Sequence, residues 1–142
     1  MAITIRWMDD ATSVLLVEYG YSLETATSKA ESSQAMSPSQ MQMHLQQCIA
    51  TVPHTVDTII DFTHAHGAVP IQTLTHLRRA ASTQPTNTGI TVFISNQDTI
   101  TRLIELMSRS SPALARQSTL TRNRSDALTV LNVIRRNRAQ VR

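Results

Sequence analysis

Three histidines and a carboxylate lie close together near the middle of the chain. His64 and His66 are separated by one residue, Asp61 precedes them, and His76 follows within the next predicted helix. Imidazole and carboxylate groups are common zinc ligands, but a zinc site needs three or four ligands, and this spacing matches no established zinc motif. We therefore expect a surface loop that contains histidine, and no metal site.

Nucleophilic catalysis is not indicated either. The single cysteine, Cys48, lies on the apolar stripe of a predicted helix, where a lone cysteine is usually a small core residue. The chain has no G-x-S-x-G motif and no glycine-rich phosphate loop, and its three glycines leave little material for one. We predict that the protein is not an enzyme and uses no cofactor.

Polar residues at the ends of predicted strands form a better candidate site, because ligands of open parallel sheets bind beyond the carboxyl ends of the strands. Helix N-termini after Asn96 and Ser125 would offer free N–H groups to an anion. The candidate ligand-binding residues are Thr63, His64, His66, Ser95, Asn96, Arg122 and Arg124. The simpler interpretation, which we favour, is that Asn96 and Ser125 are ordinary helix caps and that the arginines are solvated.

These positions belong to strands that alternate with helices. Val56–Phe62 and Gly89–Ile94 are short runs of β-branched and aromatic residues. Each is followed by turn residues and then by a helical pattern, at Ile71–Ala81 and Asp98–Met107. Such alternation is typical of βαβ units around a parallel sheet, so the predicted fold class is α/β.

The ends of the chain complete this sheet. Ala2–Trp7 alternates apolar and polar residues, and a short turn joins it to Ser13–Tyr19, so the two strands form an antiparallel hairpin. A helical stretch at Ser22–Thr51, broken near Pro38, follows the hairpin. Near the C-terminus, Gln117–Thr121 is a short last strand that precedes a final helix.

We thus predict a single-layer, mixed, mostly parallel five-stranded sheet with helices packed on it, in the order β-β-α-β-α-β-α-β-α. The length of 142 residues suits one domain, which we place at residues 1–138, followed by a disordered basic tail at 139–142. No signal peptide precedes the first strand, and no apolar run approaches the ~18 residues that span a bilayer. We expect a cytoplasmic protein without membrane contact.

Charge is unevenly distributed along the chain. The net charge is +3, and from Arg102 to Arg142 many arginines stand against Glu105 and Asp126 alone. Such asymmetry can indicate an anionic partner, so binding of a small anionic ligand or of nucleic acid through this Arg-rich C-terminal third is the alternative function. We do not expect nucleic acid, because its binders usually cluster charge more densely on one element.

The order of the elements and several segments resemble the STAS domain family (sulfate transporter and anti-sigma-factor antagonist), most of all stand-alone bacterial STAS-like proteins of unknown function. The resemblance runs from Ile3 to Ile134 and depends on the segments ITIRW, VEYG, VDTIIDF, LTHLRRA and VFISNQDTITRLIELMSR occurring in this order. It implies an α/β domain without chemistry of its own, which regulates or binds an unknown protein partner and has a homodimer as one option.

In anti-sigma-factor antagonists, the partner kinase phosphorylates a switch serine. The resemblance places that segment near Val69, Pro70 and Ile71, none of which carries a hydroxyl group. Thr73 is the nearest hydroxyl, and Thr63 lies in the same loop at a different position, so both are weak phosphorylation candidates. The predicted function is therefore a non-catalytic STAS-like module that lacks the usual phosphorylatable serine.

Overall fold

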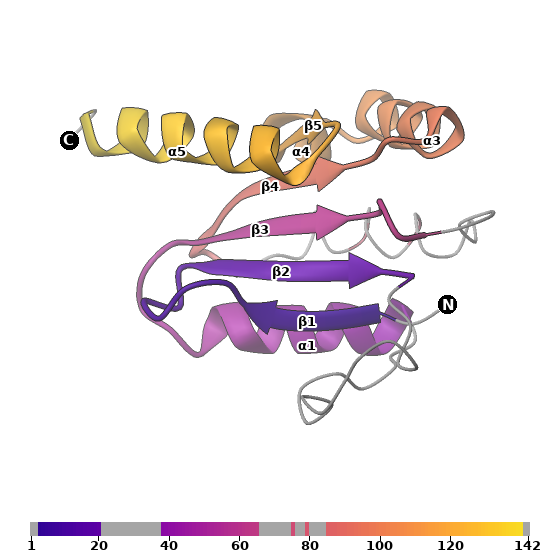
Figure 1. The fold of residues 1–142 in the computed structure, drawn as a ribbon. Coiled ribbons are helices and arrows are strands. Elements are labelled where there is room, and N and C mark those ends of the chain that lie inside the picture. The colour runs from indigo at the N-terminus through magenta and orange to yellow at the C-terminus, as the bar shows by residue number, and fades with distance from the viewer. Residues whose placement is uncertain (1–2, 21–37, 66–74, 76–78, 80–84, 141–142) are drawn as a thin grey trace.

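The computed structural model describes residues 3–20, 38–65, 75, 79 and 85–140. Within these residues the protein is an α/β fold built on one five-stranded sheet, whose strands lie in the order β1-β2-β3-β4-β5 (Figure 1). The β1–β2 pair is antiparallel and the other three pairs are parallel. The predicted fold class and the mostly parallel five-stranded sheet are confirmed.

The strands and helices have the following bounds. The strands are β1 (Ile3–Trp7), β2 (Val14–Tyr19), β3 (Val56–Asp61), β4 (Thr88–Ile94) and β5 (Ser118–Thr121). The helices are α1 (Pro38–Ala50), α3 (Asp98–Ser110), α4 (Pro112–Gln117) and α5 (Arg124–Gln140). Thr75 and Arg79 are helical, but the rest of the helix predicted at Ile71–Ala81, and the one predicted from Ser22, lie outside the described residues.

Helices cover both faces of the sheet, so every residue of β2 and β3 is buried. One face packs against α1, α3 and α4, and the other against α5, which crosses β4 and β5 (Figure 1). The sequence predicts an apolar stripe of Met41, Leu45, Cys48 and Ile49 on this helix; in α1 the first two and Ile49 are buried, and Cys48 is half-buried. None of the helices in the described part is long and apolar enough to cross a bilayer.

The sequence predicts that the final helix has a core face of Leu128 and Leu131, with Ile134 as a further candidate, and the core face of α5 differs from it by one position. Leu131 is buried as expected, but Leu128 is 38% exposed, and Ala127 takes its place against the sheet. Residues four apart lie on the same side of a helix, so Ala127 and Leu131 face the sheet together, and Leu128 is rotated by about 100° from them.

Two helix starts also differ from the prediction. The N-cap of α5 is Asn123, whose Oδ1 accepts a hydrogen bond of 2.8 Å from the N–H of Asp126, so Ser125 lies inside the first turn. The N-cap position of α3 is Gln97 rather than Asn96, and its side chain makes no capping bond. Asn123 can cap α5 in place of Ser125 because asparagine is among the best N-cap residues.

The sequence predicts an irregular connection at Ser110–Ala115 around Pro112, but a helix, α4, begins there at Pro112. Pro112 occupies its first turn, where the fixed φ of proline suits a helix, and Ser111 Oγ accepts a hydrogen bond of 3.4 Å from the N–H of Leu114. At the C-terminus, α5 continues through Gln140, so Ala139 and Gln140 are helical where a disordered tail was predicted.

Candidate functional site

The carboxyl ends of the parallel strands carry two different groups of polar side chains. The first group lies where β2 and β3 end and consists of charges that pair with one another. The second group lies where β4 and β5 end and surrounds an open hollow. The charges of the first group form ion pairs within the protein. The charges of the second group form no ion pair with the described residues and can therefore contact another molecule.

Two buried carboxylates form the centre of the first group. Glu18 and Asp61 are opposite each other on β2 and β3, and both are less than a tenth exposed. One guanidinium nitrogen of Arg124 lies 2.7 Å from Asp61 Oδ2 and 3.2 Å from Glu18 Oε2. Buried carboxylates are costly without a compensating charge. Arg124 therefore stabilises the end of the sheet.

Thr63 completes the same group. Its backbone N–H and its hydroxyl donate to Asp61 Oδ1, at 2.8 and 2.6 Å. Burial would raise the pKa of Asp61, but the hydrogen bonds from Thr63 and Arg124, together with the charge of Arg124, lower it below its usual value. The hydroxyl of Thr63 is thus occupied in holding Asp61, and a phosphate group there would break this contact.

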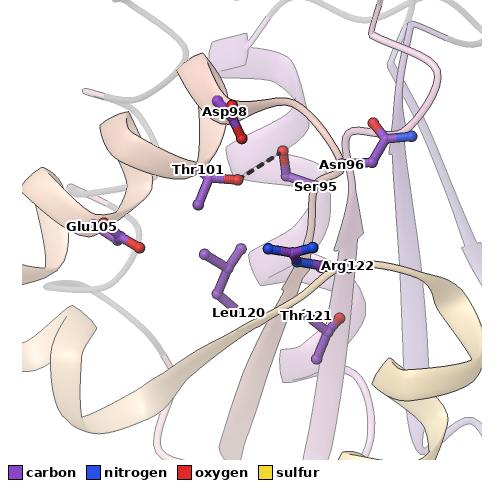
Figure 2. Close-up of a pocket in the computed structure, with 8 residues that line it drawn as sticks. All are labelled: Ser95, Asn96, Asp98, Thr101, Glu105, Leu120, Thr121 and Arg122. Carbon is purple, nitrogen blue, oxygen red and sulfur yellow. Dashed lines mark hydrogen bonds between the residues drawn. The ribbon is translucent and has the colours of Figure 1, made fainter.

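The second group surrounds a space of about 330 Å³ at the ends of β4 and β5, which we call the polar hollow (Figure 2). It is lined by Ser95, Asn96, Asp98, Thr101, Glu105, Leu120, Thr121 and Arg122. Figure 2 shows Asp98, Thr101 and Glu105 projecting from α3 on one side, and Leu120, Thr121 and Arg122 from the end of β5 on the other. Positions 98, 101 and 105 share one helix face because they are three and four residues apart.

The buried serine of the hollow has a structural role. Ser95 is 2% exposed. Its Oγ lies 3.2 Å from both the N–H and the carbonyl oxygen of Gln97, and 3.4 Å from the hydroxyl of Thr101 (Figure 2). The side chain of Gln97 in turn donates to the carbonyl oxygen of Ala65 at 2.7 Å. These bonds hold the turn between β4 and α3 in place and thereby position the α3 side of the polar hollow.

The charges of the polar hollow favour no simple anion. Asp98, Glu105 and Arg122 are exposed, and none of them forms an ion pair with the described residues. Two carboxylates therefore stand against one guanidinium. The positive end of the α3 dipole would attract an anion, but Asp98 lies in the first turn and offsets it.

The predicted site residues are thus divided among several places. Ser95, Asn96 and Arg122 line the polar hollow, whereas Thr63 and Arg124 belong to the ion-pair group. His64 is exposed in the turn after β3. The candidates His66 and Thr73 lie outside the described residues. Within the described part, no group of three or more His, Cys, Asp or Glu residues could hold a metal ion.

Leu120 and Thr121 of β5 were not among the candidates from the sequence, and neither were the three lining residues of α3: Asp98, Thr101 and Glu105. A signal for these three was present, since they follow the predicted strand Gly89–Ile94 and share one face of the predicted helix Asp98–Met107. The strand-end rule does not select them, because they lie within the helix, and the polar face of a surface helix usually meets only solvent.

Two further arginines of the C-terminal third form ion pairs at the opposite end of the sheet. Asp57 is fully buried near the start of β3, and Arg135 Nε and Arg138 Nη2 lie 3.2 and 2.9 Å from its two carboxylate oxygens. The N–H of Ile90 donates to the same carboxylate at 2.9 Å. These two arginines, like Arg124, neutralise buried acids.

Comparison with known proteins adds no assignment. No protein-family model matches the chain, and neither a curated protein nor a solved structure matches it.

Proposed function

We propose that the protein is a non-catalytic, STAS-like interaction module that recognises a partner protein at the polar hollow. The observation that carries the proposal is the contrast between neighbouring strand ends. Over β2 and β3 the charges are paired with one another, whereas Asp98, Glu105 and Arg122 remain unpaired and exposed around a concave surface. Unpaired charges on a rigid concavity are suited to recognition, because a partner can pair them without breaking internal contacts.

The composition of the hollow supports binding rather than catalysis. A nucleophilic enzyme needs a hydroxyl or thiol within reach of a general base. The hydroxyl of Ser95 is engaged with Gln97, and no histidine or cysteine lines the hollow. Cys48 is on α1, and burial raises the pKa of its thiol, which opposes formation of the reactive thiolate.

A protein partner agrees better with the charges than an anionic ligand does. The lining carries two carboxylates and one guanidinium, so a phosphate or a nucleic acid would meet net repulsion. Arg124, Arg135 and Arg138, which made the C-terminal third suggestive of an anion site, are committed to buried carboxylates. The ordered resemblance to STAS proteins supports the same class of function.

Site-specific photo-crosslinking tests this proposal. A photoreactive amino acid at Asn96, which lines the hollow just after β4, is compared with one at Thr86, which is exposed in the turn just before β4. In cells that express the chain naturally, we expect position 96 to capture one recurrent protein that position 86 does not capture, with or without nuclease. Identical products from both positions, or a product that nuclease removes, would contradict the proposal.

A further inference from the structure

A second hollow continues the first along the edge of the sheet. It encloses about 200 Å³ and is lined by Phe93, Ile104, Glu105, Ser108, Arg109, Ser118, Thr119 and Leu120. Glu105 and Leu120 line both hollows. Together the two hollows form a groove between α3 and β5, which we call the α3–β5 groove. Because α3 packs on α4, and α4 in turn packs on β4 and β5, α3 is held away from β5.

One wall of this groove is the open edge of the sheet. β5 is the last strand in the sheet order, and no described strand pairs with its outer side. The carbonyl oxygen of Thr121 accepts a hydrogen bond of 3.0 Å from the N–H of Ser95, so the backbone of Thr121 faces β4. Neighbouring residues in a strand turn their backbone groups to opposite sides, so the N–H and carbonyl of Leu120 face outward. Such an edge can pair with an added strand.

The spacing of the hollows matches an extended peptide. The second hollow follows β5 from Ser118 to Leu120, and the polar hollow continues from Leu120 to Arg122. Their centres are therefore offset by about two residues, or about 7 Å in a strand. Residues two apart in an extended chain point to the same side, so one bound strand can place a side chain in each hollow.

The two hollows select different side chains. Phe93, Ile104 and Leu120 give the second hollow an apolar lining; Glu105 is shared with the polar hollow, and Arg109 is the one charged lining residue that the second hollow does not share. The polar hollow carries an excess of one negative charge, from Asp98 and Glu105 against Arg122. An apolar side chain suits the former and a positively charged one suits the latter.

We propose that the α3–β5 groove binds an extended segment of a partner protein, which adds as a strand to the outer edge of β5. This segment carries an apolar residue and a lysine or arginine two positions apart. The inference depends on the proposed function and deepens it, since it specifies how the partner is held and which residues it must present.

Selection from a random octapeptide library on the full chain tests the motif. We expect enrichment of peptides in which an apolar residue and a lysine or arginine are two positions apart. In an enriched peptide, N-methylation of the residues that face β5 should weaken binding about tenfold, since each loses a backbone hydrogen bond, whereas methylation of the alternate residues should have little effect. No enrichment, enrichment of acidic residues, or equal sensitivity at all positions would overturn the proposal.

A charge exchange tests the placement of the basic residue. Glu105→Lys should weaken binding of the lysine peptide about tenfold and strengthen binding of the same peptide with glutamate in place of lysine. Arg102→Glu is the matched control, because Arg102 is exposed on α3 and lines neither hollow. Loss of binding to both peptides, or an equal effect of the control, would contradict the placement.

Two further outcomes separate the inference from the proposed function. If position 96 captures a partner but no peptide binds the groove, the interaction module stands and strand addition is wrong. If the chain alone sediments as a dimer that enriched peptides dissociate, the occupant is a second copy of this chain, and the proposed partner segment is overturned.

Discussion

Arg124 provides the most decisive test of how the sheet is stabilised. Replacement by methionine keeps the length and apolar stem of the side chain but removes the charge that compensates Asp61 and that, together with Arg6 of β1, compensates Glu18. Breaking a fully buried ion pair typically costs 3–5 kcal/mol. The guanidinium is 37% exposed, and Thr63 would still donate to Asp61, so the cost should be lower. We expect a loss of about 2 kcal/mol in the free energy of unfolding near neutral pH.

The pH dependence identifies the cause of this loss. The pKa of Asp61 is lowered in the folded protein, so its contribution to stability is present above the unfolded pKa and is lost as the pH falls through the folded value. Methionine at position 124 should raise the folded pKa of Asp61. The difference between the wild type and the variant should therefore be largest near pH 7 and shrink as the pH falls below about 4 towards the lowered pKa of Asp61 in the wild type.

Urea denaturation near pH 7 and below about pH 4 measures these differences in the free energy of unfolding. Arg122→Met is the matched control, because Arg122 is a nearby exposed arginine without an ion pair in the described part of the chain, and its change should stay within about 0.5 kcal/mol. Asp61→Asn combined with Arg124→Met should be more stable than Arg124→Met alone, since a buried charge is removed. A loss that is independent of pH, or that equals the control, would refute the electrostatic explanation.

Three other substitutions test local features by thermal or urea unfolding. Asn123→Ala should cost about 1 kcal/mol through loss of the α5 cap, and Ser125→Ala much less; a larger effect at 125 would show that the cap is misassigned. Gly20→Ala should cost about 2 kcal/mol or more, because φ is +81° and the added Cβ would lie 2.1 Å from the carbonyl oxygen of His64; an unchanged midpoint would contradict this close approach. Asn87→Ala should cost about 1–3 kcal/mol, since its amide donates to three backbone carbonyls between α1 and β3; a neutral effect would mean that water replaces it.

The sequence predicted strands better than helix ends because the two depend on different amounts of information. Buried strands such as VDTIID can be recognised from a continuous run of β-branched and aliphatic residues, which is uncommon in other elements. The start of a helix depends on which of several adjacent polar residues accepts a hydrogen bond from a free backbone N–H of the first turn. Asn123 and Ser125 are both good caps by type, and only their backbone positions decide between them.

The candidate site was predicted in part for a similar reason. The rule that ligands bind at carboxyl strand ends selected Ser95, Asn96 and Arg122, and these three residues line one hollow. The same rule could not separate Arg122 from Arg124, which are two residues apart. Arg122 points to the hollow and Arg124 to a pair of buried acids, because the chain turns into α5 between them.

Part of the unequal distribution of charge along the chain has an intramolecular explanation. Glu18, Asp57 and Asp61 are buried acids of β2 and β3, and three of their cationic partners, Arg124, Arg135 and Arg138, belong to α5, while Arg6 of β1 also pairs with Glu18. The acidic strands and the basic helix are far apart in sequence but meet at both ends of the sheet. Charges of this kind fix where and in which direction α5 lies, since Arg124 and Arg138 are near its two ends. An excess of arginine in one part of a sequence can therefore indicate buried acids elsewhere in the same chain, and it implies an external anion only where the arginines remain unpaired.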